Sequence, residues 1–160
     1  MTPASMDAAE IAYYISETFS GVDVVAANGD SFFFYDPGKT LRPDRRMPFA
    51  TLVVSDAHDQ VSDLNRDGVF RLNIGVARET YRALFGQPPV AWTTVAGHDY
   101  AVLDQVLPHP VYGFMSWVCV LNPSPETFQQ TVQGYLAEAH AQAAERFARR
   151  KPEDERETWA

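Results

Sequence analysis

The stretch VFRLNIGVA, residues 69–77, constrains the fold of this chain more than any other part of its sequence. Phe70, Leu72, Ile74 and Val76 are apolar at alternate positions, and the residues between them are Arg71, Asn73 and Gly75. Because successive side chains of a β-strand point to opposite faces, this alternation predicts a strand with one wholly apolar face. An apolar sheet face has to be covered by a second layer, so helices are expected to pack on a sheet.

Four further strands are predicted around this one. Residues 22–36 contain two β-prone runs on either side of Asn28-Gly29, a two-residue signal that favours a hairpin turn. FATLVVSD, residues 49–56, and MSWVCVLNP, residues 115–123, are the remaining strand candidates. The second of these is almost continuously apolar, which is typical of a strand that is covered on both faces.

Helices are predicted at both ends of the chain and in the middle. Asp7 and Glu10 form a capping-box pattern that starts an N-terminal helix. RETYRALFG, residues 78–86, predicts a short middle helix that stops at its glycine. Ser124 followed by Pro125 is typical of a helix start, and it opens a long C-terminal helix with an apolar stripe.

The predicted fold class is α+β, with an antiparallel sheet of about five strands and the three helices packed on it. Residues 1–151 are expected to form a single domain, and residues 152–160 a charged C-terminal tail. The segment 87–112 resists assignment. VAWTTVA, residues 90–96, alternates like a strand, and YAVLDQVL, residues 100–107, could form a helical turn. Either this segment hides short elements or it forms a lid.

The charge balance narrows the classes of partner. The net charge is −8 at pH 7, and an acidic surface repels phosphate backbones, which disfavours nucleic acid. The basic loop 39–46 is a local exception, and the basic residues 146–151 close the last helix, where cations favour the negative end of the helix dipole. The N-terminus lacks a signal-peptide pattern, and no apolar run approaches about 20 residues. The expected location is therefore the cytoplasm, with no membrane partner.

Four residues are predicted to line a ligand pocket: Arg71, Asn73, His109 and Tyr112. The polar residues of the strand could simply face water, but they would face a roofed pocket if segment 87–112 folded over them. Arg71 could then hold a carboxylate or phosphate through two parallel hydrogen bonds. Gly75, on the same strand face, would leave room for close approach.

His109 stands between two prolines, which bias it toward an extended backbone and aim its ring in one direction. Such a rigid imidazole suits a catalytic general base or a ligand donor, and His109 is the only catalytic candidate. It equally suits a histidine that ties the long loop to the sheet through one hydrogen bond. The structural role is the favoured interpretation of the two.

No metal and no cofactor are predicted. DLNRDG, residues 63–68, matches the first half of a calcium loop, but the twelfth position of that loop is Ile74 where a glutamate is needed. The acidic loop as a whole offers N and O donors at Asp56, His58, Asp59 and Asp63, and is interpreted as solvated.

The single cysteine, Cys119, is expected to be a buried core residue, because free cysteines in apolar strands are generally inert. His98 lies in AGHDY without a proline beside it and is a weaker candidate than His109. The chain contains none of the common signatures of a serine-hydrolase elbow, a zinc protease or a nucleotide-binding loop. Whether the chain is an enzyme therefore stays open.

Four long motifs carry a resemblance to a known family. They are DSFFFYDP, RRMPFATLVVSD, GVFRLNIGVARETYRALFG and HDYAVLDQVLPHPVYGFMSWVCVLNP. Through them the chain resembles an uncharacterised bacterial family, number 6194 in the series of domains of unknown function (DUF). The resemblance runs from the first hairpin to the last helix. It implies no activity, cofactor or catalytic residue.

Three functional hypotheses follow. The favoured one is a protein that binds or transforms a small molecule in a pocket between the sheet and segment 87–112. The second is a non-catalytic interaction module, in which the aromatic run 32–34 contributes to an interface, as in a homodimer. The third and least favoured is a nucleic-acid binder that uses the basic loop 39–46.

Overall fold

The computed structural model describes residues 5–90 and 95–156 of the 160-residue chain. In these residues a six-stranded antiparallel sheet has the strand order β1-β2-β3-β4-β6-β5. The strands are β1 (Val22–Ala27), β2 (Asp30–Tyr35), β3 (Ala50–Val53), β4 (Arg71–Gly75), β5 (Leu107–Pro108) and β6 (Trp117–Leu121). The predicted α+β fold is confirmed. Beyond the five predicted strands, the sheet gains the two-residue strand β5.

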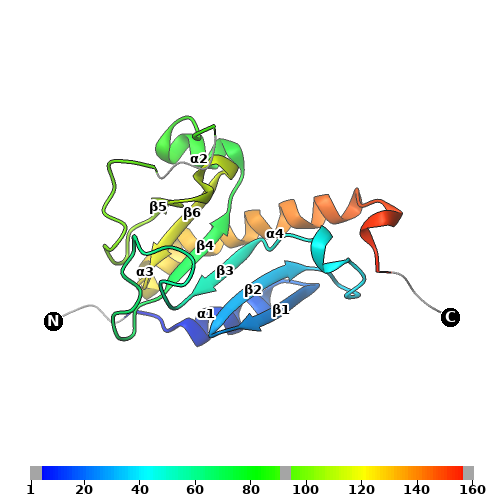
Figure 1. Cartoon of the computed structure of the whole chain (residues 1–160), viewed down its shortest axis with the longest axis horizontal. Coiled ribbons are helices and arrows are strands. Elements are labelled where there is room, and N and C mark those ends of the chain that lie inside the picture. The colour runs from blue at the N-terminus through cyan, green and yellow to red at the C-terminus, as the bar shows by residue number, and fades with distance from the viewer. Residues whose placement is uncertain (1–4, 91–94, 157–160) are drawn as a thin grey trace.

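The helices are α1 (Ala8–Thr18), α2 (Arg78–Phe85), α3 (Pro125–Thr127) and α4 (Gln133–Ala148). A π-helical turn over Phe128–Val132 joins α3 to α4, and 3-10 turns occupy Pro43–Arg45, Tyr112–Met115 and Pro152–Asp154. Figure 1 shows α4 running behind the strands, with α1 below it on the same side. These two helices and the π-helical turn bury Ile11, Ile15, Leu136 and Val132 in one core with Leu72, Ile74, Val118 and Val120 of the sheet.

The predicted local signals position these elements. The Asp7 carboxylate accepts a hydrogen bond from the Glu10 amide at 2.8 Å, which completes the capping box that starts α1. Asn28 and Gly29 both have positive φ angles, 55° and 86°, as a tight hairpin turn between β1 and β2 requires. The Ser124 hydroxyl accepts from the Thr127 amide at 3.1 Å and caps the start of the last helix.

The two faces of the sheet differ in chemistry. One face is the apolar surface under α1 and α4, and the other, here the Arg71 face, carries Thr51, Arg71, Asn73 and Cys119. Thr51, Asn73 and Cys119 lie directly opposite one another on β3, β4 and β6. Arg71 and Asn73 are only 2% and 3% exposed, so the alternative that they face water is wrong. Two irregular segments cover them: the loop between β3 and β4, and part of segment 87–112.

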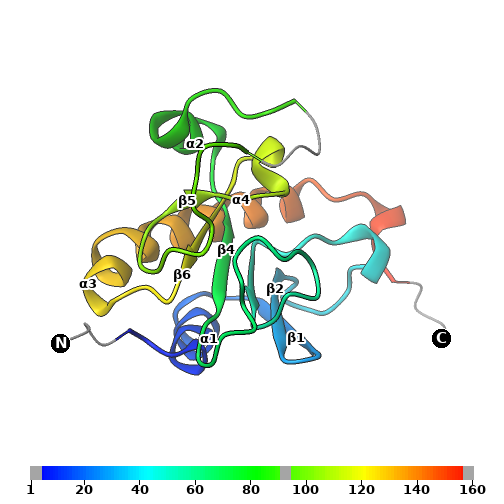
Figure 2. The same cartoon turned by 60° about the vertical axis from the view of Figure 1, so that its left-hand side comes forward.

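Segment 87–112 contains one element that its sequence does not reveal. Leu107 and Pro108 pair with Cys119 and Val118 of β6, so this part of the segment forms the outermost strand of the sheet. Figure 2 shows β5 beside β6 at this edge of the sheet. Residues 100–107 do not form a helix: a turn lies at residues 100–101, and Leu107 begins β5. The stretch 90–96 falls mostly on residues 91–94, outside the described part of the chain.

Residues 152–156, where the charged tail was expected to begin, lie against the loop that follows β2. The Arg42 amide donates to the Asp154 carbonyl at 2.8 Å, and Leu41 forms a β-bridge with Glu155. The helices in residues 5–90 and 95–156 are too short or too polar to cross a membrane.

Candidate functional site

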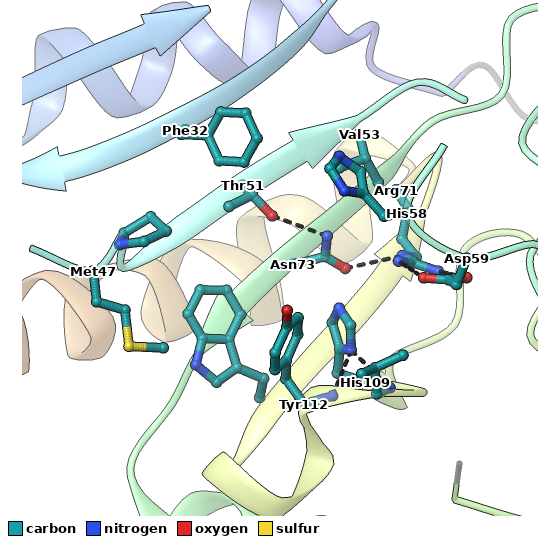
Figure 3. A pocket seen from close by; sticks show the side chains of 13 residues that line it. Phe32, Met47, Thr51, Val53, His58, Asp59, Arg71, Asn73, His109 and Tyr112 are labelled. Carbon is teal, nitrogen blue, oxygen red and sulfur yellow. Dashed lines mark hydrogen bonds and ion pairs between the residues drawn. The ribbon is translucent and has the colours of Figure 1, made fainter. Parts of the chain in front are cut away.

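A pocket of about 390 Å³ opens on the Arg71 face and is named the Arg71 pocket. Its lining includes all four residues predicted to share a site: Arg71, Asn73, His109 and Tyr112. Figure 3 shows them converging from β4 and from the chain before β6. The walls are otherwise mainly apolar: Phe32, Met47, Pro48, Val53, Val111 and Trp117. The sequence thus located the residues, while their role in binding stays a prediction.

Arg71 forms the floor of this pocket, and its guanidinium is already engaged. Nη1 and Nη2 donate to the two carboxylate oxygens of Asp59 at 3.0 and 2.7 Å, and Nη1 also donates to the Ser62 hydroxyl at 2.9 Å. This is the bidentate geometry that the sequence suggested for a bound anion, but an internal carboxylate supplies it. An anionic ligand could reach the fork of Arg71 only by displacing Asp59.

Asn73 extends the same network across the sheet. Its side-chain oxygen accepts from Arg71 Nε at 3.0 Å, and its side-chain nitrogen donates to the Thr51 hydroxyl at 2.9 Å. Figure 3 shows this line of dashed bonds from Thr51 through Asn73 and Arg71 to Asp59. Because both ends of the amide are occupied, Asn73 fixes the orientation of Arg71.

Asp59 balances the buried charge. Burial alone would raise the pKa of its carboxyl group, but the hydrogen bonds and positive charge of Arg71 outweigh it, and the net pKa is lowered. Asp59 therefore stays ionised near neutral pH, and the pair carries no net charge. The pocket floor is polar yet electrically neutral.

His109 projects into the pocket with one ring nitrogen. Nδ1 accepts hydrogen bonds from the backbone amides of Val111 and Tyr112 at 3.1 and 2.9 Å, so in the neutral ring the proton sits on Nε2. Burial, followed by the charge of Arg71, lowers the pKa of His109 to about 3. Figure 3 shows the other end of the ring pointing away from these amides into the pocket. His109 is thus a neutral hydrogen-bond donor at physiological pH.

The geometry bears on both roles suggested for His109. Its backbone amide donates to the Trp117 carbonyl at 2.9 Å, and its Nδ1 caps the turn that follows it. These contacts tie the long loop to the sheet, as the structural interpretation expected. A general base needs a free lone pair, whereas the lone pair of Nδ1 is occupied and Nε2 carries a proton.

Aromatic rings line the mouth of the pocket. Tyr112 is 39% exposed, and its ring centroid lies 5.0 Å from that of His109. Phe32 of β2 lies on the opposite side (Figure 3). The open space expected at Gly75 does not exist, because a Cβ atom built there would lie 2.9 Å from Cε2 of Trp117. The glycine instead admits the indole, which forms part of the pocket wall.

The acidic loop does not gather its side chains. The carboxylate of Asp56 accepts from the Leu64 amide, His58 bonds to Asp30, and Asp63 lies 3.7 Å from Arg66. With Asp59 on Arg71, the four suggested metal donors face four different partners. Within residues 5–90 and 95–156, no group of three His, Cys, Asp or Glu side chains is placed to hold a metal ion.

Two other residues considered as candidates, Cys119 and His98, have no part in the Arg71 pocket. Cys119 is fully buried, and burial raises the pKa of its thiol to about 12, so it is a core residue. His98 is exposed and has edge contacts with Phe85, and it does not line the Arg71 pocket.

The aromatic run 32–34 and the basic loop 39–46, which suggested an interaction module and a nucleic-acid binder, mostly contact other parts of the fold. Of the aromatic run, Phe33 is in the core and Phe34 lies under the guanidinium of Arg46 at 4.1 Å. Arg46 of the basic loop pairs with Asp23 and Asp36 at 2.7 and 3.0 Å. Much of this loop's charge is therefore balanced internally.

Sequence reasoning missed several residues of the site, among them Thr51, Trp117 and Asp59, which pairs with Arg71. Thr51 could have been found, because it is a polar residue in a predicted strand whose other buried residues are apolar. For Asp59 the signal is weaker. A buried arginine needs a carboxylate, but the loop offers several at similar distances along the chain.

Comparison with known proteins gives one match. The family model described as "Family of unknown function (DUF6194)" matches residues 6–152. Neither the curated proteins nor the solved structures gave a match.

Proposed function

The chain belongs to the DUF6194 family of unknown function, and we propose that it binds a small, flat, uncharged organic molecule in the Arg71 pocket. The observation that carries this proposal is the protonated Nε2 of His109, a neutral donor aimed into a largely apolar hollow. A few fixed polar groups among apolar and aromatic walls are typical of small-molecule sites.

The charge of the ligand follows from the floor of the pocket. Arg71 is neutralised by Asp59, so a ligand anion would gain little from the arginine and would be repelled by the carboxylate. A ligand cation would meet the guanidinium at the same depth. An uncharged molecule avoids both costs.

The shape and polarity of the ligand follow from the walls. Phe32, Tyr112 and Trp117 present rings around the opening, and rings of this kind favour flat apolar or heteroaromatic groups. The donor of His109 favours a carbonyl oxygen or an unprotonated ring nitrogen as its partner. The volume of about 390 Å³ lies in the lower part of the range for small-molecule sites.

The same geometry shapes any reaction at this site. A neutral histidine that donates from Nε2 can polarise a bound carbonyl, but it does not abstract a proton in this tautomer. Binding is therefore proposed as the function, and His109 as a ligand-binding residue.

The test starts with native mass spectrometry of the purified protein, followed by a ligand-observed NMR screen of small heteroaromatic compounds. The key variant is His109→Asn, because the shorter side chain can still accept from the Val111 and Tyr112 amides but has no donor at the position of Nε2. We expect it to weaken binding about tenfold, which corresponds to about 1.4 kcal/mol.

His98→Asn is the matched control, since His98 is exposed and outside the pocket. It should bind as tightly as the wild type. Equal affinity of the wild type and His109→Asn for every compound found would exclude the Arg71 pocket as the site. Association of the protein with itself, without a ligand and blocked by loss of Phe32, would favour the interaction-module hypothesis instead.

A further inference from the structure

We propose that a second site, independent of the Arg71 pocket, binds a phosphate group in a cleft between the loop that follows β2 and the C-terminal end of α4. This arginine cleft has a volume of about 260 Å³. Five arginines line it: Arg45, Arg46, Arg146, Arg149 and Arg150. Figure 1 shows the two contributing segments, cyan and orange, meeting beside the C-terminal turn.

The fold brings these arginines together from two basic groups about 100 positions apart in the sequence. Residues 152–156 hold the groups in place, because the Arg42 amide donates to the Asp154 carbonyl at 2.8 Å and the Arg156 amide to the Thr40 carbonyl at 2.6 Å. The five arginines make the cleft positively charged, although the chain as a whole carries a net charge of −8. A cationic cleft on an acidic protein attracts anions selectively to one place.

Two of the five arginines have carboxylate partners. Arg46 pairs with Asp23 and Asp36, and Arg150 pairs with Glu155 at 2.7 Å. The side chains of the other three, Arg45, Arg146 and Arg149, have no hydrogen bond or ion pair with any residue in the described part of the chain. The cleft therefore contains three guanidinium groups whose donors are available to a ligand.

The arginines also act on one another. Partial burial, followed by the positive charge of Arg149, lowers the pKa of Arg146. Neighbouring cations without a counter-ion raise the free energy of the folded state, and a bound anion would remove this repulsion. Among the described residues, Asp154 is the one carboxylate that lines the cleft, and it accepts from the Lys151 amide at 2.9 Å and offsets a single charge.

The helix dipole accounts for only part of this arrangement. The C-terminal end of α4 favours cations, and Arg150 donates to the Phe147 carbonyl there at 3.0 Å. Arg45 comes from a three-residue 3-10 turn on the opposite wall, so the dipole of α4 does not account for it. Arginines on two facing walls suit an oxyanion with acceptors on several sides, and phosphate has that geometry.

The phosphate could be free or part of a larger molecule. A smaller hollow lined by Met47, Trp117 and Arg146 lies between the arginine cleft and the Arg71 pocket, and Met47 lines all three. A phosphate ester would therefore have room to extend away from the arginines along the protein surface.

The test is isothermal titration calorimetry with inorganic phosphate, pyrophosphate and adenosine monophosphate, at constant ionic strength with chloride as the reference anion. We expect Arg146→Gln and Arg149→Gln each to weaken phosphate or pyrophosphate binding at least tenfold. The control is Arg82→Gln, an exposed arginine of α2 outside the cleft, which should bind like the wild type.

The remaining outcomes are also decisive. Tighter binding of adenosine monophosphate than of inorganic phosphate indicates a phosphate ester, and the reverse order indicates a free phosphate. The proposal is overturned if chloride competes as well as phosphate, or if Arg82→Gln weakens binding as much as Arg146→Gln. His109→Asn should leave phosphate binding unchanged, so failure of the first proposed site would not affect this result.

Discussion

Asp59 and Arg71 face each other through two parallel hydrogen bonds of 3.0 and 2.7 Å, although one lies in a loop and the other in the central strand β4. Their side chains are 12% and 2% exposed. A buried ion pair repays its desolvation only when the geometry is good and the remaining donors are satisfied. Ser62 and Asn73 accept two of the three donors that Asp59 leaves. The pair therefore fastens the covering loop to the sheet.

Replacement of Asp59 by asparagine should destabilise the protein by about 3–5 kcal/mol, because it leaves Arg71 charged and buried without a counter-charge. The substitution preserves the size of the side chain, so the loss reports on charge. Urea unfolding at pH 7, followed by tryptophan fluorescence, measures the change. Asp63→Asn is the control, since that carboxylate is 64% exposed and 3.7 Å from Arg66, and should cost under 1 kcal/mol. Similar losses in both variants would contradict the role of the pair.

Removal of both charges should be less damaging than removal of one. The double variant Asp59→Leu/Arg71→Met replaces the ion pair by apolar side chains and leaves no buried charge unpaired. We expect its unfolding free energy to exceed the value predicted by adding the two single losses by at least about 2 kcal/mol. Simple additivity in the same urea experiment would show that the two side chains act independently.

His109 should make stability depend on pH. Its folded pKa of about 3 lies below its ordinary value of 6.5, so between these values the unfolded chain binds a proton that the folded protein does not. Stability is therefore complete above about 6.5 and falls as the pH is lowered, by up to about 1.4 kcal/mol per pH unit. The stabilising contribution of Asp59 is lost only below its ordinary pKa of 3.8, which is outside the pH range measured.

The measurement compares the wild type with His109→Asn at pH 7.5 and 5.0. Because all other residues are the same in the two proteins, the difference reports on position 109. The stability advantage of the wild type should shrink by roughly 2 kcal/mol over this range. A difference that does not change with pH would mean that His109 is not kept neutral by folding.

The elements that could be predicted have local causes. The capping box of Asp7 and Glu10, the turn at Asn28-Gly29 and the alternation of 69–77 each act over a few neighbouring residues, and each forms as expected. The strand β5 could not be predicted, because it has two residues and one is Pro108. It exists because β6 offers it an open edge, which is a property of the assembled sheet.

The candidate site also has a part that could be predicted from the sequence and a part that could not. Arg71 and Asn73 share a strand face by their spacing, and the prolines around His109 fix its backbone, so their meeting could be anticipated. Which acidic residue reaches Arg71 depends on the path of a loop without a repeating pattern. The neutral floor of the pocket, and therefore the preference for an uncharged ligand, emerges only from the structure.

Gly75 and the Trp117 indole set the shape of one pocket wall, and the substitution Gly75→Ala should disturb it. The added Cβ would lie 2.9 Å from Cε2 of the ring, so the indole must move or the strand must shift. We expect a loss of about 1–3 kcal/mol and an altered near-UV circular dichroism signal from tryptophan.

Gly134→Ala is the control, because nothing lies within 4 Å of its Cβ position in α4 and alanine favours a helix. That variant should gain up to about 1 kcal/mol with an unchanged near-UV signal. An unchanged signal in Gly75→Ala would show that the glycine does not position the ring.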